Sequence, residues 1–384
     1  TATTEIYTLS LHDALPDLAY LFTRAVKFFL ENGYTLKQNV DESGIVLVNS
    51  CCVTEDKIAT SRAALEAART RGKGKRVVLF GCMADFPLPD IERDGLVCIG
   101  PGSLGELDRL FPHRIPVDRI TAHKFSPAFY EPGQGLGYQD YFVMIARGCS
   151  NNCSYCNIKR VKGAVRSEPP ETILREIRQG LSMGVQEFVL LGDDCASYGH
   201  DRNADLVGLI EDLFAAGKGF RLKLNYLFPG YVTNHLDRLK GIFETKRISY
   251  VNIPLQSGSQ RILNLMNRRY AVRKVWEAVR QLRALAPGTR FCTHMMINFP
   301  TETEDDFMAS LNLADAFDTV LFLHYSDNRG TAAAGIYPKV PAETALKRLD
   351  RAADYVNGRG MKSGAVISDF NCGLPYNLSR NRGG

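Results

Sequence analysis

The sequence predicts an α/β protein in which a small parallel sheet on the N-terminal side is followed by a partial (β/α)6 barrel. Two observations predict this class. Short apolar runs typical of buried strands alternate with helical patterns along most of the chain. From residue 138 onwards the strand-then-helix unit repeats about six times, which is fewer than the eight units of a complete barrel.

The N-terminal domain is assigned to residues 18–111. Its strands are predicted at 44–49 (GIVLVN) and 76–80 (RVVLF), and its helices at 19–32 and 57–70. Strands that alternate with helices in this way are expected to run parallel in one sheet.

The barrel is assigned to residues 138–355, after a linker at 112–137 that is rich in Pro, His and Gly. Residues 356–384 are expected to form a tail without a recognisable series of strands. The barrel strands are predicted at 141–146, 187–191, 221–226, 250–253, 291–297 and 319–325. Helices between them are predicted at 171–183, 205–216, 260–266 and 272–285.

Composition indicates an ordinary globular protein. The 384 residues exceed one average domain, 45% of them are hydrophobic and 23% are charged. No apolar run reaches the roughly 18 residues of a membrane span, and the N-terminus lacks a secretion signal, so we expect a cytoplasmic protein. The formal net charge of +5 permits an anionic partner without requiring one.

The most informative motif is RGCSNNCSYC at residues 147–156, in which Cys149, Cys153 and Cys156 have the spacing C-x3-C-x2-C. Three thiolates in one loop can hold three irons of a [4Fe–4S] cluster. No fourth ligand follows locally, so one iron stays open for a small molecule. The alternative is a structural zinc site, but zinc normally takes four ligands in paired C-x2-C units, and no second pair exists here. Reduced thiols agree with a cytosolic setting.

The carboxyl ends of parallel strands are where ligands bind in such sheets, so residues there are candidates for a binding site. Gly192 and Asp193 follow the strand at 187–191. A glycine lets the backbone approach a ligand closely, and the carboxylates of Asp193 and Asp194 can bind a cationic amino group. The alternative is an ordinary Gly-Asp turn.

A second polar loop, containing Gln256, Ser257 and Ser259, follows the strand at 250–253 and opens a helix. This helix start can bind an anion or a ribose. Alternatively, Ser257 or Ser259 simply caps the helix.

A third loop follows the strand at 291–297. Thr301 and Glu304 have the spacing of a capping box there, which leaves Glu302 a weak ligand candidate. Arg166, ten residues after the last cysteine of the motif, can pair with a carboxylate, although most arginines lie on a solvated surface.

The cysteine motif resembles the signature of radical S-adenosylmethionine (SAM) enzymes, whose architecture is a curved, partly open (β/α)6 sheet. Further segments resemble the methylthiotransferase branch of that superfamily in order and approximate spacing. They are residues 192–199, 254–259, 266–270, 299–307 and 325–332. The resemblance covers about residues 18–350, most of the chain.

The resemblance implies that Cys149, Cys153 and Cys156 hold a [4Fe–4S] cluster whose open iron binds SAM. A reductant such as flavodoxin or ferredoxin would then drive SAM cleavage to a 5′-deoxyadenosyl radical. It further implies that a methylthio group replaces a hydrogen on an unactivated carbon, in a tRNA adenosine or in an aspartate of a ribosomal protein. The residues expected to contact SAM are Tyr155, Arg166, Gly192, Asp193, Gln256 and Ser257.

A second [4Fe–4S] cluster in the N-terminal domain, held by three more cysteines, is also implied by the resemblance. Cys51 and Cys82 are two of these, because each lies just after a predicted strand and two thiolates can therefore converge. The alternative is a pair of small buried hydrophobic residues.

The expected third cysteine is missing from residues 10–16, where the chain reads SLHDALP. We therefore interpret residues 1–17 as a disordered or artefactual N-terminus, since 6–16 resemble translated sequencing-adaptor text and show no strand pattern. The rival interpretation is a natural variant in which Cys52, Cys98 or His12 replaces the cysteine.

The C-terminal side also departs from the family, whose members usually carry an RNA-binding TRAM barrel after the radical SAM core. About thirty residues follow the last predicted helix, too few for that barrel. Either the chain is truncated or the substrate differs.

A basic stretch at 57–76 can contact phosphates. The alternative is a solvated helix face, because no aromatic residues interleave with the charges for base stacking. Its seven cations are Lys57, Arg62, Arg69, Arg71, Lys73, Lys75 and Arg76.

The favoured interpretation is a methylthiotransferase acting on tRNA. One alternative is radical C–S chemistry on a peptide, a ribosomal protein or a small metabolite. The other is a non-catalytic or degenerate iron–sulfur protein.

Overall fold

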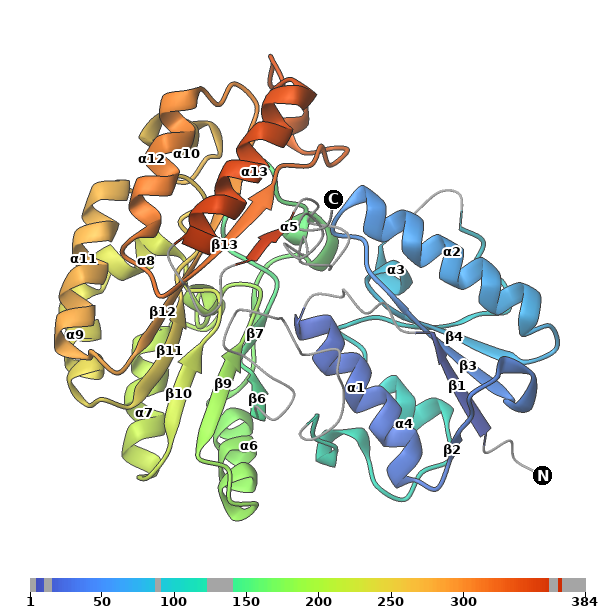
Figure 1. Ribbon diagram of the computed structural model, residues 1–384. Coiled ribbons are helices and arrows are strands. Elements are labelled where there is room, and N and C mark those ends of the chain that lie inside the picture. The colour runs from blue at the N-terminus through green and yellow to red at the C-terminus, as the bar shows by residue number, and fades with distance from the viewer. Residues whose placement is uncertain (1–4, 10–15, 87–90, 123–140, 359–364, 368–384) are drawn as a thin grey trace. The chain divides into compact units, whose positions relative to one another are not determined.

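The protein is represented by a computed structural model that describes residues 5–9, 16–86, 91–122, 141–358 and 365–367 (Figure 1). The chain divides into two compact units. The first contains residues 1–129 with 160–162, and the second contains residues 130–159 and 163–384. In the described part of the chain, no helix is long and apolar enough to cross a membrane.

The first unit is a parallel five-stranded sheet with the strand order β2-β1-β3-β4-β5. Its strands are β1 (Glu5–Leu9), β2 (Thr35–Leu36), β3 (Ile45–Ser50), β4 (Arg76–Gly81) and β5 (Val97–Ile99). Its helices are α1 (Pro16–Glu31), α2 (Glu55–Arg71), α3 (Cys82–Asp85) and α4 (Glu106–Leu110). The predicted parallel sheet and the two predicted strands are confirmed.

Strand β1 corrects the sequence analysis, which expected no strand before residue 17. Ile6 is fully buried, and β1 pairs with β3 from Ile6↔Ile45 to Leu9↔Val48. Five residues are too few to show a pattern on their own, whereas pairing on both sides satisfies the backbone groups of β1. Residues 10–15, including His12, lie outside the described residues.

The predicted linker also begins later than expected. Asn32, after α1, donates from its side-chain amide to the Ile115 carbonyl (2.9 Å) and accepts from the Ile115 backbone N–H (2.7 Å). Arg24 donates to the carbonyls of Val117 and Ile120. These bonds fasten residues 115–120 to α1, so this part of the expected linker belongs to the first unit.

The second unit is a seven-stranded parallel sheet with the order β14-β13-β12-β11-β10-β9-β6. The strands are β6 (Tyr141–Met144), β9 (Glu187–Leu191), β10 (Arg221–Leu224), β11 (Ile248–Asn252), β12 (Arg290–Ile297), β13 (Thr319–His324) and β14 (Ala365–Ile367). All six predicted strands are present. The seventh, β14, falls in the expected tail, because pairing with β13 orders a run too short to be recognised alone.

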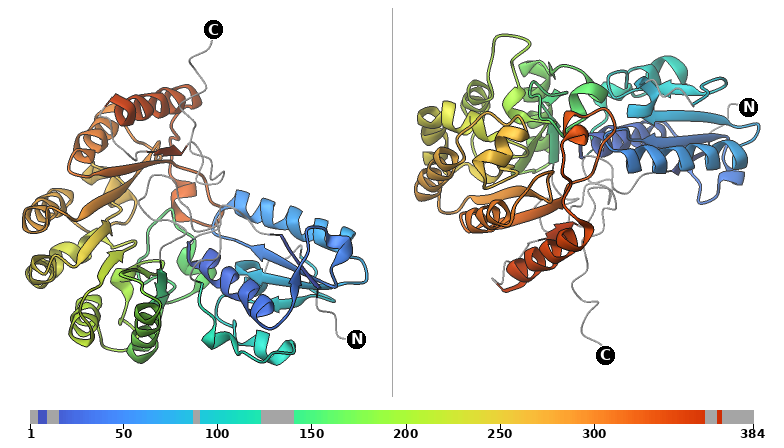
Figure 2. Two further views of the ribbon diagram at one scale, coloured as in Figure 1. Left: turned by 60° about the horizontal axis from the view of Figure 1, so that its bottom comes forward. Right: turned by 90° about the horizontal axis from the view of Figure 1, so that it is seen from above.

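Helices connect these strands and lie on one side of the sheet (Figure 1, Figure 2). They are α6 (Pro170–Ser182), α7 (Leu206–Ala216), α8 (Pro229–Asn234), α9 (Leu236–Glu244), α10 (Gln260–Leu265), α11 (Val272–Leu285), α12 (Glu304–Ala314) and α13 (Ala342–Gly358). The main hydrophobic core lies between helices and sheet and includes Leu224, Val251 and Met295. Side chains alternate between the two faces of a strand, so the residues next to these along each strand point to the opposite face. This face, which the described helices of the second unit do not cover (Figure 1, Figure 2), is the inner face of the sheet.

Gly81 holds the ends of β3 and β4 together. Its φ is +98°, and a Cβ at this position would meet the Ser50 carbonyl oxygen at 2.3 Å. The Ser50 hydroxyl donates to the Phe80 carbonyl (2.6 Å) and accepts from the Met83 backbone N–H (3.2 Å). This close approach sets where Cys82 begins α3.

We therefore expect Gly81→Ala to lower the free energy of unfolding by about 3 kcal/mol, since it combines a backbone conformation reserved for glycine with a clash. Urea denaturation measures the change. Gly74→Ala is the matched control: its φ is +79° with nothing within 4 Å of the added Cβ, so it should cost only about 1 kcal/mol. Equal effects of the two substitutions would show that the contact with Ser50 contributes nothing.

Candidate functional site

The three-cysteine loop follows a short antiparallel ribbon formed by β7 (Ala146–Arg147) and β8 (Arg166–Ser167). Gly148 turns the chain out of β7 with φ +76°, and a Cβ there would meet the Ala164 carbonyl oxygen at 2.5 Å. Its backbone N–H donates to the Asp193 carboxylate (2.8 Å). The loop therefore leaves the sheet in a direction fixed by the neighbouring β9 loop.

Each sulfur of this loop accepts a hydrogen bond. Cys149 accepts from the backbone N–H and the side-chain amide of Asn151, at 3.4 and 3.3 Å. Cys156 accepts from the Ile158 backbone N–H (3.4 Å), and Cys153 accepts from the Arg268 guanidinium (3.5 Å). Such bonds stabilise thiolates and tune iron–sulfur clusters, so the donor set fits a three-thiolate cluster site.

Without a metal, the thiols of Cys149 and Cys156 favour their protonated form. Burial, followed by the nearby Asp194 carboxylate, raises the pKa of Cys149 to about 11. Burial and the neighbouring Cys153 raise the pKa of Cys156 to about 12. Metal binding at these residues must therefore release protons. Among the described residues, no group of three His, Cys, Asp or Glu side chains is arranged to hold a single metal ion.

The predicted ligand loop after β9 anchors the cysteine loop. Asp193 accepts from Gly148 as described, and Gly192 packs near the Ala146 carbonyl. Buried Asp194 accepts from the Asn151 side-chain amide (2.6 Å) and from the Ser197 hydroxyl (2.9 Å). Asp194 also caps a short 3-10 helix. The Gly-Asp turn is therefore present, and its two carboxylates also position the cysteine loop.

The loop after β11 contains two predicted SAM contacts, Gln256 and Ser257, whose surroundings differ. Ser257 is fully buried and accepts from the Ser259 backbone N–H (3.1 Å), while Ser259 is the N-cap of α10. Capping, one of the two alternatives, thus applies to Ser259, while Ser257 stays a predicted SAM contact. Gln256 has φ +69°, and its buried side-chain oxygen has no hydrogen-bond partner in the protein, so Gln256 stays a ligand candidate.

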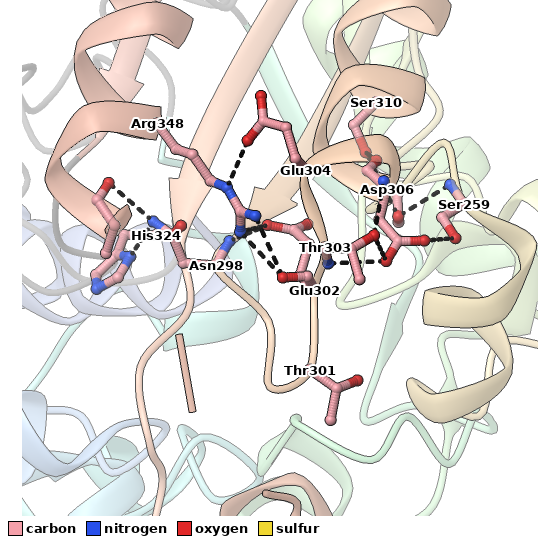
Figure 3. A network of polar contacts seen from close by, with 12 residues as sticks. Ser259, Asn298, Thr301, Glu302, Thr303, Glu304, Asp306, Ser310, His324 and Arg348 are labelled. Atoms are coloured by element: carbon pink, nitrogen blue, oxygen red, sulfur yellow. Dashed lines mark hydrogen bonds and ion pairs between the residues drawn. The ribbon is translucent and has the colours of Figure 1, made fainter. Parts of the chain in front are cut away.

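The expected capping box at Thr301 and Glu304 is wrong by two residues. Thr303 and Asp306 form the box at the start of α12, and Thr301 has φ +68° in the preceding turn (Figure 3). The Asp306 carboxylate also accepts from the Ser259 hydroxyl and the Arg261 guanidinium. The non-local partners explain the shift, because they select Asp306 over Glu304.

Glu302 is not presented to a ligand. Its carboxylate accepts from the Asn298 backbone N–H (2.7 Å) and from the buried guanidinium of Arg348 in α13 (3.1 Å) (Figure 3). This buried ion pair joins the loop after β12 to α13. The weak ligand assignment of Glu302 is therefore replaced by a structural one.

Arg268 contacts the cysteine loop, although no sequence pattern marks it as a candidate. Its guanidinium donates to four groups: Cys153 Sγ, the Tyr155 hydroxyl (3.3 Å), the Pro254 carbonyl (2.7 Å) and the Tyr270 hydroxyl (3.4 Å). It lies within the segment at 266–270 but 115 residues from Cys153, so no local spacing marks it. Arg166, in contrast, is exposed on β8 opposite Arg147.

In the first unit, Cys51 and Cys82 are brought together. Each has 1% exposure, they follow adjacent strands paired at Ser50↔Gly81, and their thiols hydrogen-bond to each other. The bond from Cys82 lowers the pKa of Cys51 and raises that of Cys82. Cys98 lies on β5 opposite Leu79, where its charged neighbours are Arg93 and Asp85.

Most cations of the basic stretch have structural roles. Lys57 is buried, Arg69 pairs with Glu66 (3.5 Å), and Lys75 donates to the Asp41 carbonyl (2.8 Å). Arg76 stacks over the Phe111 ring at 4.3 Å. Exposed Arg71 and Lys73 are left as the best phosphate contacts, so the stretch is a smaller RNA-binding surface than its charge suggests.

Comparison with known proteins matches both units to families. Residues 143–314 match the radical SAM superfamily, and residues 22–95 match the uncharacterized protein family UPF0004. A ribosomal protein uS12 methylthiotransferase RimO from Pelotomaculum thermopropionicum is 33% identical over 83% of this chain and 75% of its own. A tRNA-2-methylthio-N(6)-dimethylallyladenosine synthase from Moorella thermoacetica is 30% identical over 85% of this chain and 77% of its own.

Solved structures support the fold. The radical SAM methyltransferase TsrM from Kitasatospora setae aligns with a TM-score of 0.55 at 13% identity, over 90% of this chain and 76% of its own. The cobalamin-dependent radical SAM enzyme OxsB aligns with a TM-score of 0.52 at 12% identity, over 92% of this chain and 56% of its own.

The Asp306 carboxylate yields a pH-dependent prediction. Burial acts to raise its pKa, but the hydrogen bonds from Arg261, Ser259 and Thr303 outweigh burial and hold the pKa below its ordinary value. Its contribution to stability is therefore present above about pH 4 and lost as the pH falls further. Asp306→Asn should lower the free energy of unfolding by about 2 kcal/mol at neutral pH, and by less at about pH 3.

Denaturant unfolding at both pH values measures this difference. Asp305→Asn, an exposed neighbour in the same helical turn, is the control and should change stability little at either pH. A loss that is the same at both pH values would contradict the role assigned to the Asp306 charge.

Proposed function

Since this chain belongs to the radical SAM methylthiotransferase family, whose members use a [4Fe–4S] cluster and SAM, we propose that it inserts a methylthio group into a C–H bond of a tRNA nucleobase. The observation that carries the proposal is the cysteine loop. Its three sulfurs come from one turn, and each accepts an N–H hydrogen bond.

Cys149, Cys153 and Cys156 are the proposed ligands of the SAM-binding cluster. When bound, the cluster and SAM supply a 5′-deoxyadenosyl radical that takes a hydrogen atom from the substrate. The protein fixes the ligand geometry through Asp193 and Asp194. Arg268 places a buried positive charge beside Cys153, which offsets part of the charge that three thiolates introduce.

Cys51 and Cys82 are proposed as two ligands of a second cluster that provides the sulfur. Their support is the buried contact between two thiols at the carboxyl ends of adjacent strands. The third ligand stays open among Cys52, Cys98 and His12. The residues that follow Leu9 directly lie outside the described part.

We propose a tRNA nucleobase as the first substrate candidate because the inner face of the second sheet carries the neutral amides of Asn225 and Asn252. Lys223 on this face pairs with Glu187 (3.5 Å), so its charge is already compensated. A neutral base suits such a surface better than a carboxylate. An aspartate of a ribosomal protein is the second candidate, favoured by the structural use of most cations in the basic stretch.

A flavodoxin or ferredoxin is the proposed reductant. The cytoplasm is the proposed compartment, because it keeps thiols reduced.

The two cysteine sets should separate in mutants. Cys149→Ala, Cys153→Ala and Cys156→Ala should each abolish 5′-deoxyadenosine formation from SAM, because each removes an iron ligand. Cys51→Ala and Cys82→Ala should leave SAM cleavage intact but stop sulfur insertion. Mass spectrometry of 5′-deoxyadenosine and of methylthio products, after anaerobic reconstitution, measures both.

Cys292→Ala is the control, since this buried thiol on β12 belongs to neither set and should keep both activities. Undiminished SAM cleavage in any variant of the first set would exclude its cluster assignment. Full iron content with full sulfur transfer in both variants of the second set would show that Cys51 and Cys82 only pack in the core.

If tRNA is the substrate, its binding should weaken steeply as salt increases, because phosphate contacts release counterions. Reversing two exposed cations of the basic stretch, in Arg71→Glu with Lys73→Glu, should weaken binding and flatten this dependence. Electrophoretic mobility shifts from about 50 to 200 mM salt measure both effects. A salt-independent affinity, or no binding at low salt, would favour the ribosomal-protein substrate.

A further inference from the structure

Two buried asparagines lie side by side on the inner face of the second sheet. Asn225 directly follows β10, and Asn252 is the last residue of β11. The neighbouring Leu224 and Val251 pack in the core beneath the helices, so both asparagines point the other way. The strands pair at Leu224↔Val251, which places the two amides at the same level, at the carboxyl ends of the strands.

These amides lack the partners that buried polar groups normally have. Asn225 is fully buried, and neither its side-chain nitrogen nor its oxygen has a hydrogen-bond partner in the protein. Asn252 is also fully buried: its nitrogen lies 2.9 Å from His294 Nε2, while its oxygen is unpartnered. An unpaired buried amide destabilises a fold, so such a group needs an explanation outside the folded chain itself.

The surroundings add no charge that would bind an anion. Burial lowers the pKa of His294 to about 3, so this ring is neutral at physiological pH. Lys223, on the same face two residues before Asn225, pairs with Glu187 (3.5 Å), and the neighbour of Asn225 on β9 is the apolar Leu191. A ligand here must therefore be neutral and able to both donate and accept hydrogen bonds.

The backbone of Asn225 also contacts the loop after β9, which in turn positions the cysteine loop. Cys195 donates from its thiol to the Asn225 carbonyl (2.8 Å), and its backbone N–H donates to the Tyr226 carbonyl (2.9 Å). Cys195 follows Asp193 and Asp194, the two carboxylates that position the cysteine loop. A ligand bound to Asn225 would thus sit at the same end of the sheet as the proposed cluster.

We propose that Asn225 and Asn252 bind the hydrogen-bonding edge of the substrate base, a planar heterocycle that carries adjacent donor and acceptor atoms, as an aminopurine does. A carboxamide pairs with both atoms of such an edge. A carboxylate offers acceptors only and would leave both asparagine oxygens unpaired. This assignment rests on the proposed nucleobase substrate and makes Asn225 a determinant of substrate specificity.

Asn225→Leu tests the assignment, because it removes the amide and breaks no hydrogen bond of that amide within the protein. We expect kcat/KM for methylthiolation of total bacterial tRNA to fall roughly 10- to 100-fold. SAM affinity and 5′-deoxyadenosine formation without tRNA should stay at wild-type levels. The melting temperature should rise by roughly 2–4 °C, since a buried unpaired amide is gone. Asn234→Leu, at an exposed asparagine that ends α8, is the control and should change none of these quantities.

A second variant, Asn225→Ser, has a smaller side chain and therefore controls for a packing defect caused by leucine. It should also lose tRNA activity without losing SAM cleavage. Wild-type tRNA activity in both variants would overturn the inference, as would a loss of SAM affinity, which would place SAM at the amides instead. A wild-type protein that cleaves SAM but forms no methylthionucleoside would contradict the proposed function itself, so the two failures are distinguishable.

Discussion

Groups distant in sequence hold the cysteine loop that we propose as one ligand set. Three cysteines within eight residues do not by themselves point at a common centre. Asp193 fixes the Gly148 amide where the loop begins, Asp194 holds Asn151, and Arg268 reaches Cys153 from beyond α10. These contacts come from the ends of β9 and from the segment after α10, so the parallel sheet that aligns those ends is a precondition for the site.

The same constraint organises both units. Parallel strands bring their carboxyl ends to one edge, which places Cys51 beside Cys82 in the first unit and the loop after β9 beside Asn225 in the second. Polar side chains collect at these edges although they are buried. Glu302 and Asp306 show how such groups are held: each accepts hydrogen bonds from donors around it, and each links a loop to a helix. Neither polar atom of the Asn225 side chain has such a partner in the protein.

Local sequence patterns were sufficient to predict most strands of the second sheet and the position of the cysteine loop. Apolar runs located the six barrel strands, and the C-x3-C-x2-C spacing located the proposed cluster loop. Errors arose where long-range contacts decide the structure. Strands β1 and β14 are ordered by pairing with β3 and β13, Asp306 replaces Glu304 in the capping box because Ser259 and Arg261 bind it, and Arg268 acts across 115 residues. At the start of α10 the cap is Ser259, and Ser257 stays a predicted SAM contact, because a serine near a helix start carries one signal for two roles.

The central claim is that the loop at residues 149–156 holds a [4Fe–4S] cluster with one iron open to SAM. Electron paramagnetic resonance of the reduced, reconstituted protein, recorded with and without SAM, tests it most directly. In a Cys51→Ala, Cys82→Ala background, which leaves only the loop cysteines of the two proposed sets, we predict a reduced-cluster signal that changes when SAM is added. A signal unaffected by SAM, or none at all, would contradict the account.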